Sequence, residues 1–249
     1  DITMAEGWHG TDSATHQIAF AVLPDGHTVI GLQHCRMNDR RGYVARIKGM
    51  QFNLPNDLYN EYSRELITGS GKSTFTSPPR KEESFSLSGK WTNIENKIGL
   101  IGLYGADNFT IHRHPSRRAG ALQSLFVEEI CFPGIIETMK FEANEIILDA
   151  GWAVISSADA GAAKYFYAAQ QKVLLAGEFE DVRAVRIEAL NQKIYYVLAN
   201  FDEVEISIPI DIFCEDAQLT DLASETVYSA RKNIRLSPCQ GMVLESTFT

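Results

Sequence analysis

The sequence predicts an all-β protein, with a large antiparallel β-sandwich followed by a smaller antiparallel β-sandwich and few short helices. Short apolar runs rich in β-branched and aromatic residues recur along the 249 residues, and turn residues separate them. Few segments repeat their apolar residues at the helical period of about 3.6. With 45% hydrophobic residues, the chain can fill one large core or two modest ones.

The first part of the chain has the pattern of β-hairpins and short strands. Residues 16–35, HQIAFAVLPDGHTVIGLQHC, contain two apolar runs around Pro24-Asp25-Gly26, a sequence typical of tight turns. Further strands are expected within segments of the same texture, at residues 43–54, 96–105, 108–114, 124–132 and 139–157. Together these runs predict a large antiparallel sheet system.

Two segments are candidates for helices. Residues 55–66, PNDLYNEYSREL, place Pro55 and Asp57 where a helix would begin, and residues 159–174, DAGAAKYFYAAQQKVL, are rich in alanine. Their tyrosine and phenylalanine residues suit strands as well. Helices are therefore expected to be few and short.

The last third of the chain has the pattern of a compact β-sandwich. Two strand-like runs lie on either side of Asn191-Gln192, and residues 233–245, NIRLSPCQGMVLE, have the pattern of a closing hairpin. Near residues 158–178, alanines and glycines replace many of the large apolar residues, so the strand pattern is weaker there. The predicted division is a large sandwich over residues 1–165 and a small C-terminal sandwich over residues 166–249.

The stretch ITGSGKSTFTSPPR, residues 67–80, contains Gly-Lys-Ser-Thr and invites comparison with a phosphate-binding loop. Such a loop needs a glycine five positions before Gly71, where Leu66 stands, and a helix after it, which Pro78 and Pro79 prevent. Nucleotide binding is therefore not expected. The glycine, serine and proline content predicts a long exposed loop between two strands.

Charge and composition exclude several classes of partner and cofactor. The net charge of −9 gives no general attraction to nucleic acid or to anionic membranes, and no apolar run approaches the roughly 20 residues of a membrane-spanning helix. Cys35, Cys131, Cys214 and Cys239 are scattered without the spacing of a zinc site. No cofactor and no metal are expected. The start at Asp1, in mid-pattern and without methionine, suggests a piece of a longer chain.

The tail resembles the small antiparallel β-domain that closes many glycoside hydrolases. Three segments carry the resemblance: YYVLANFDEVEISIPI, LTDLASETVY and IRLSPCQGMVLE. They contain an aliphatic-Asn-aromatic turn at Ala199-Asn200-Phe201, a Leu-X-Asp-Leu turn from Leu219 to Leu222, and a Leu-hydroxyl-Pro-X-X-Gly-hydrophobic ending from Leu236 to Val243. The resemblance implies a fold and assigns no catalytic residue.

Residues 15–155 more loosely resemble the large β-sandwich or supersandwich regions attached to glycoside hydrolases and polysaccharide lyases. The segments HTVIGLQHCRM, KGMQFNLPNDLYN and KWTNIENKIGLIGLYG carry this resemblance. In such enzymes the acid and base carboxylates usually lie on a separate barrel or toroid of helices. The resemblance therefore implies a catalytic domain or chain preceding Asp1 as partner, with an oligo- or polysaccharide as a further ligand.

His112 and His114 are the candidate catalytic residues. Both would point to the same face of a strand, the geometry of a proton-transfer pair, although a polar solvent face explains the spacing equally well. Trp8, Trp91, Trp152 and Tyr104 are candidate sugar-stacking platforms, with a role as core or domain-interface aromatics as the alternative. Arg117 lies in a basic cluster that would bind the carboxylate of an acidic sugar.

The leading functional hypothesis is an accessory all-β region of a carbohydrate-active enzyme, most simply a glycoside hydrolase, that supports a catalytic domain and contributes to carbohydrate binding. One alternative is a self-sufficient β-sandwich polysaccharide lyase or hydrolase that uses His112 and His114. Another is a carbohydrate-binding module without catalysis. The sequence assigns neither the sugar nor the cellular compartment.

Overall fold

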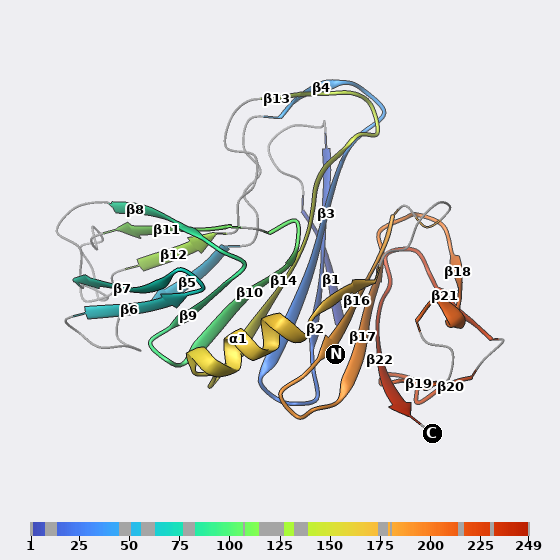
Figure 1. The fold of residues 1–249 in the computed structure, drawn as a ribbon. Helices are drawn as coiled ribbons and strands as arrows, with labels where there is room; N and C mark the ends of the chain where they lie inside the picture. Colours follow the sequence, from blue (N-terminus) through green and yellow to red (C-terminus); the bar gives the residue numbers. More distant parts are fainter. Residues whose placement is uncertain are drawn as a thin grey trace, which may run out of the picture.

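The computed structural model describes residues 2–7, 14–44, 51–55, 63–76, 83–106, 108–114, 127–131, 139–173, 179, 181–213, 217–229 and 232–248. Antiparallel strands dominate this part of the chain, where one α-helix and one short 3-10 helix accompany them (Figure 1). The predicted all-β class is confirmed. No helix among the described residues is long and apolar enough to cross a membrane.

The central element is an eight-stranded antiparallel sheet in the order β1-β2-β3-β14-β10-β9-β6-β7, here called the large sheet. Its strands are β1 (Ile2–Gly7), β2 (Ala14–Val22), β3 (Thr28–Met37), β6 (Ser63–Thr68), β7 (Gly71–Thr76), β9 (Trp91–Ile94), β10 (Ile98–Tyr104) and β14 (Ile146–Ser156). β14 pairs with β3 on one side and with β10 on the other, so strands that are distant in sequence meet at the centre of the sheet.

The predicted hairpin at Pro24-Asp25-Gly26 connects β2 to β3. Asp25 fixes this turn, because its Oδ1 accepts hydrogen bonds from the backbone N–H groups of His27 at 3.0 Å and Thr28 at 2.9 Å. Its Oδ2 accepts a third from the Thr28 hydroxyl at 2.6 Å. Gly26 has a positive φ of 72°, which glycine adopts without steric cost.

Two smaller sheets accompany the large sheet. A four-stranded sheet, β5-β12-β11-β8, lies at the β6–β7 end of the molecule, and β13 pairs with β4 above β3 and β14 (Figure 1). The bounds are β4 (Gly42–Val44), β5 (Gln51–Pro55), β8 (Glu83–Ser88), β11 (Asn108–His114), β12 (Val127–Cys131) and β13 (Met139–Phe141). Apart from β8, which lies in a segment without a strand prediction, these strands, with β10 and β14, confirm the strands expected between residues 43 and 157.

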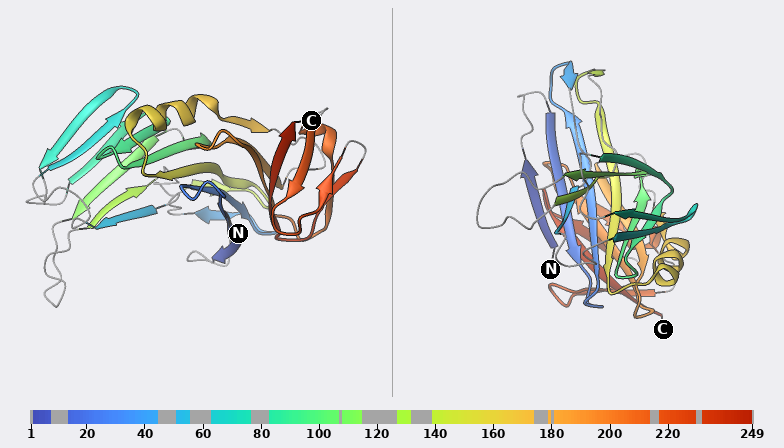
Figure 2. Two further views of the ribbon diagram at one scale, coloured as in Figure 1. Left: turned by 90° about the horizontal axis from the view of Figure 1, so that it is seen from below. Right: turned by 90° about the vertical axis from the view of Figure 1, so that its left-hand side faces the viewer.

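The chain ends in a six-stranded sheet, β15-β16-β17-β22-β19-β20, here called the C-terminal sheet. Its strands are β15 (Gln171–Val173), β16 (Val182–Glu188), β17 (Ile194–Asn200), β19 (Ala217–Asp221), β20 (Val227–Tyr228) and β22 (Gly241–Phe248). A two-stranded sheet of β18 (Ile206–Pro209) and β21 (Asn233–Leu236) shares an apolar core with it. Figure 2 shows the C-terminal strands in orange and red at the end opposite the four-stranded sheet.

One helix, α1 (Ala160–Ala169), confirms the second predicted helical segment. It begins after Asp159, whose Oδ1 accepts a hydrogen bond from the backbone N–H of Ala162 at 2.7 Å. Its buried residues are Ala163 and Phe166, three positions apart and therefore on one face of the helix. The helix thus contributes apolar surface to the core, and Gln171 already belongs to β15.

The large sheet and the C-terminal sheet share one apolar core. Ile30 and Ile155 come from the large sheet, Tyr195 and Val197 from the C-terminal sheet, and Phe166 from α1, all of them 2% exposed or less. A second cluster, around Trp152, belongs to strands of the large sheet and their surroundings. The division expected after residue 165 stays a prediction, and the shared core joins residues from both sides of it.

The first helix prediction is wrong where the structure describes it. Residues 63–66 belong to β6, which pairs with β7 on one side and with β9 on the other. Leu66 is buried while Glu65 and Ile67 are half-buried, so the burial alternates as in a strand. Pairing on both sides outweighs the helix-start signal at Pro55 and Asp57, and residues 56–62 lie outside the described residues.

The Gly-Lys-Ser-Thr stretch is part of a hairpin rather than a long loop, so that expectation is wrong as well. Thr68 pairs with Gly71, which leaves a two-residue turn of Gly69 and Ser70 between β6 and β7. Gly71 has a φ of 134°, which favours glycine. An antiparallel hairpin at Gly71–Thr76 takes the place of the helix N-terminus that a phosphate-binding loop requires.

A substitution of Gly31 tests the packing of the large sheet. Gly31 of β3 stands opposite Trp152 of β14, and a Cβ added at Gly31 would overlap the indole ring. Because Trp152 is only 1% exposed, the ring has little room to move. We expect Gly31→Ala to lower the free energy of unfolding by about 1–3 kcal/mol, measured by chemical denaturation.

Gly69→Ala is the matched control, because a Cβ there would meet only Trp91, at 3.5 Å or more, on an exposed turn. Its effect should stay within about 0.5 kcal/mol. Equal effects of the two substitutions would contradict the proposed contact between Gly31 and Trp152.

Candidate functional site

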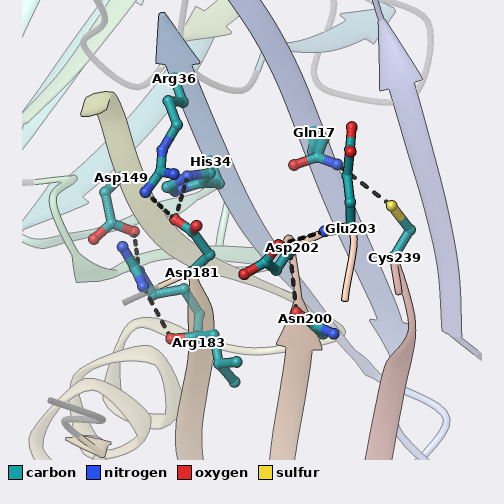
Figure 3. A network of polar contacts seen from close by, with 11 residues as sticks. Gln17, His34, Arg36, Asp149, Asp181, Arg183, Asn200, Asp202, Glu203 and Cys239 are labelled. Carbon is teal, nitrogen blue, oxygen red and sulfur yellow. Dashed lines mark hydrogen bonds and ion pairs between the residues drawn. The ribbon is translucent and has the colours of Figure 1, made fainter. Parts of the chain in front are cut away.

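A polar groove of about 640 Å³ lies where the large sheet meets the C-terminal sheet. Its walls come from β2 and β3, from the residue before β16 and from the residues after β17 (Figure 3). We call it the seam groove and define it by Gln17, His34, Arg36, Asp181, Asp202 and Glu203. It brings together polar side chains that are as much as 186 positions apart in sequence, from Gln17 to Glu203.

The best-connected residue of the seam groove is Asp181. Arg36 Nη2 lies 2.5 Å from Asp181 Oδ1, and His34 Nε2 lies 3.4 Å from the same oxygen. His34 and Arg36 are two residues apart in β3 and therefore share a face of the large sheet. The His34 ring also stacks on Phe201, with the ring centroids 5.3 Å apart. A charged contact and a ring contact thus join the two sheets at one place.

The environment keeps Asp181 ionised. Burial by itself raises the pKa of this carboxyl, but the hydrogen bond from His34 and the positive charges of Arg36, His34 and Arg183 outweigh it, so the pKa is lowered from its usual value. A general acid in glycoside cleavage needs the opposite, a raised pKa. Asp181 is therefore suited to holding the seam together and poorly suited to donating a proton.

A second ion pair crosses the same seam with the charges exchanged. Arg183 of β16 donates from Nε to Asp149 Oδ1 of β14 at 2.7 Å, and its Nη1 donates to the Val182 carbonyl at 2.9 Å. In the first pair the cation belongs to the large sheet, and in this pair the anion does (Figure 3). Sliding one sheet against the other would separate both pairs, so together they favour a single alignment.

The Asn200 side chain shapes the rim of the groove. Its Nδ2 donates to the carbonyls of Val204 at 2.9 Å, Leu236 at 3.3 Å and Ser237 at 3.0 Å, and Asn200 is fully buried. Its Oδ1 accepts from the backbone N–H of Asp202 at 3.0 Å. This network holds the turn after β17, which places Asp202 and Glu203 beside the large sheet.

The groove offers hydrogen-bond donors and acceptors without a metal centre. Among the described residues, no group of three or more His, Cys, Asp or Glu side chains gathers in a way that could hold a metal ion. Gln17 donates to Cys239 Sγ at 3.5 Å, and Asp202 Oδ1 accepts from the Glu203 N–H at 2.6 Å. Hydrogen-bonding groups from both sheets therefore line the groove.

The predicted catalytic pair lies outside this groove. His112 and His114 belong to β11, where His112 pairs with Glu129 of β12 and with Ser84 of β8. The sequence has no carboxylate within that strand, but the neighbouring strand supplies one opposite His112. The structure describes the backbone of these residues and not their side chains, so their catalytic role stays a prediction.

Three of the predicted sugar-binding residues lie in the part of the chain that the structure describes, and one of them, Trp152, is 1% exposed. Trp91 and Tyr104 are 8% and 9% exposed and belong to the apolar core that the two sheets share. This burial favours their alternative role as core aromatics, because a buried ring offers no open face to a sugar. Trp8 and Arg117 lie outside the described residues.

The sequence reasoning missed the seam groove. Arg36 and Asp181 have no local sequence signal that joins them in a site, because their meeting with His34 depends on the packing of two sheets. A usable signal is present at the end of β3, where the polar His34 and Arg36 alternate with the buried apolar Cys35 and Met37. A buried strand that carries His and Arg on one face needs a partner for both, and Asp181 is that partner.

No protein-family model and no curated protein matches the chain. Solved structures with a partial likeness include an α-galactosidase from Lactobacillus brevis, with 11% identity and a TM-score of 0.42. A GH36 α-galactosidase from Geobacillus stearothermophilus has 10% identity and a TM-score of 0.36, and the galactosidase domain of an α-galactosidase-sucrose kinase has 7% and 0.35. Each match covers 64% of this chain and 27% of the other, so the chain spans about a quarter of their length.

Replacement of Asp181 tests the seam. Because the native pKa of this carboxyl is lowered, its ionised form stabilises the fold above the unfolded-state pKa of about 3.9, and that stability is lost as the pH falls through the native pKa. We expect Asp181→Asn to lower the free energy of unfolding by about 1–3 kcal/mol at pH 7. The difference in the free energy of unfolding between Asp181→Asn and the wild type should shrink below about pH 4. Urea denaturation at a series of pH values measures it.

Asp39→Asn serves as the control, since Asp39 is an exposed carboxylate 4.0 Å from the exposed Arg40. Its effect should stay below about 1 kcal/mol. A stability difference between Asp181→Asn and wild type that grows on acidification would contradict the assigned role of Asp181.

Proposed function

We propose that this chain is an accessory all-β region of a carbohydrate-active enzyme, most simply a glycoside hydrolase, that packs against and supports a catalytic domain. The observation that carries the proposal is the way the tail segments bind one another. Asn200, from the aliphatic-Asn-aromatic turn, donates to the Leu236 and Ser237 carbonyls at the start of the closing segment. The segments that resemble the glycoside-hydrolase tail are therefore joined by hydrogen bonds.

The Leu-X-Asp-Leu turn belongs to the same unit. Asp221 accepts from the Ala223 N–H at 3.1 Å and from the Ser224 hydroxyl at 2.5 Å, which closes the turn after β19. Leu222 donates from its backbone N–H to the Val243 carbonyl at 3.0 Å. Turn residues that pair in this way support a shared fold more strongly than the same residues scattered along the surface.

The ionisation state of Asp181 also favours a structural role of the groove over a catalytic one. This carboxylate is kept ionised and is held by Arg36 and His34, so it is occupied in joining the sheets. A region that packs on a catalytic domain needs a rigid body, and the shared core with its two ion pairs supplies one.

The alternative of a self-sufficient lyase or hydrolase is favoured by one observation. The register of β11 and β12 sets Glu129 opposite His112 and Glu128 opposite Arg113. A histidine beside a carboxylate is a common arrangement for proton transfer. The alternative therefore predicts activity that depends on His112.

Assays of the purified chain separate the two functions. We expect no release of reducing ends or unsaturated products from a panel of neutral and acidic polysaccharides. The complete gene, or a gene next to it, should encode a catalytic domain.

Cleavage that His112→Ala abolishes, while the exposed His27→Ala on the β2–β3 turn leaves it unchanged, would replace the proposal by the alternative. A complete gene and gene neighbourhood without any catalytic domain would also contradict it.

A further inference from the structure

The seam groove has the size of a ligand site and polar walls on both sides. Its volume of about 640 Å³ falls within the range of roughly 300–1,000 Å³ that is usual for small-molecule sites. One wall belongs to the large sheet and includes Thr15 and Asn38, and the other belongs to the turn after β17 and includes Asp202 and Glu203. A molecule in the groove would therefore contact both parts of the fold at once.

Several of the polar groups are held in place before any ligand arrives. Thr15 donates from its hydroxyl to Asn38 Oδ1 at 2.9 Å, and Asn144 donates from its backbone N–H to the Asn38 carbonyl at 3.0 Å. On the opposite wall, Asp202 is fixed by the N–H of Glu203. The Asn38 and Asp202 side chains are therefore oriented in advance, and such groups lose little conformational entropy on binding, which raises affinity.

One buried group in the wall has hydrogen-bonding capacity left over. The His34 side chain is 3% exposed, its Nε2 faces Asp181, and its Nδ1 has no hydrogen-bond partner among the described residues. Buried nitrogens of this kind are normally satisfied by water or by a ligand hydroxyl. This observation is independent of the carboxylates and points to a hydroxylated guest.

The charge of the groove limits the kind of guest. Four carboxylates line it, from Asp39, Asp181, Asp202 and Glu203, against two basic side chains, those of His34 and Arg36. Arg36 is already engaged with Asp181. An anionic ligand would meet unpaired negative charge and is disfavoured, whereas neutral hydroxyl groups donate well to carboxylates.

We propose that the seam groove binds a short neutral oligosaccharide and rejects its uronic-acid counterpart. The choice of a saccharide rests on the proposed function, while the preference for a neutral ligand follows from the groove itself. Glu203 and Asp202 accept hydrogen bonds from sugar hydroxyls on one wall, and the Asn38 and Asn144 amides contact the sugar from the other. The ligand thereby bridges the large sheet and the turn after β17.

The test begins with an array of short neutral oligosaccharides, whose best binder is titrated into the purified chain by isothermal titration calorimetry. Galactotriose and trigalacturonic acid form a matched neutral and anionic pair of probes. We expect Glu203→Gln and Asn144→Gly, one on each wall, each to weaken binding of the neutral ligand at least about tenfold. Glycine is chosen at residue 144 because Asn144 has a φ of 60°.

Glu205→Gln is the matched control, because Glu205 is exposed, two residues from Glu203, and does not line the groove. It should leave the affinity unchanged, and circular dichroism should show the same fold for all variants. The neutral best binder should bind at least about tenfold more tightly than trigalacturonic acid.

Three results would overturn the proposal: no binder on the array, equal binding of neutral and anionic probes, or equal effects of Glu203→Gln and Glu205→Gln. Failure of this proposal leaves the accessory role untouched, because that role is judged by cleavage and by the gene. Cleavage of a polysaccharide by the chain would refute the accessory role without refuting binding in the groove.

Discussion

The apolar contact between the large sheet and the C-terminal sheet is the interaction on which the rest of the molecule depends. Residues such as Ile155 and Tyr195 lose nearly all contact with water in it, and α1 adds Phe166 to the same core. Apolar burial is strong but non-directional, so by itself it does not decide how two flat faces are aligned. The polar contacts at the edge of the core supply that direction.

The reciprocal pairs Arg36–Asp181 and Asp149–Arg183 serve this purpose. Each pair has lost part of its hydration, so its contribution to stability is modest compared with that of the core. Their opposite polarity makes other alignments of the sheets unfavourable, because a shifted partner would leave a half-buried charge unpaired. The same geometry creates the seam groove, since the side chains that lock the sheets also form its walls. The alignment of the two sheets and the proposed ligand site therefore depend on one set of residues.

Local patterns in the sequence predicted most of the fold and little of the site. The hairpin at Pro24-Asp25-Gly26 and helix α1 are fixed by neighbouring residues, here Asp25 and Asp159, and were predicted correctly. Residues 63–66 were misjudged because their pairing with β7 and β9 outweighs the local helix signal. The seam groove was missed because Arg36 and Asp181 are 145 positions apart and meet only through packing of the sheets. In the tail, the sequence also indicated that distant segments belong to one domain. The Asn200 side chain explains this, because it hydrogen-bonds the closing segment at Leu236 and Ser237.

The hairpin that carries Gly-Lys-Ser-Thr has a consequence for solubility. β7 is the outermost strand of the large sheet, and one edge of its backbone has no neighbouring strand in that sheet. Exposed edges of this kind tend to pair with other molecules and to start aggregation. Lys72 lies on this edge strand, is 58% exposed and pairs with Glu65 on β6, so it brings a charge to the place where a second sheet would dock. A stretch that resembles a nucleotide site thus places a charged side chain on the last strand of the large sheet, where it disfavours pairing with another strand.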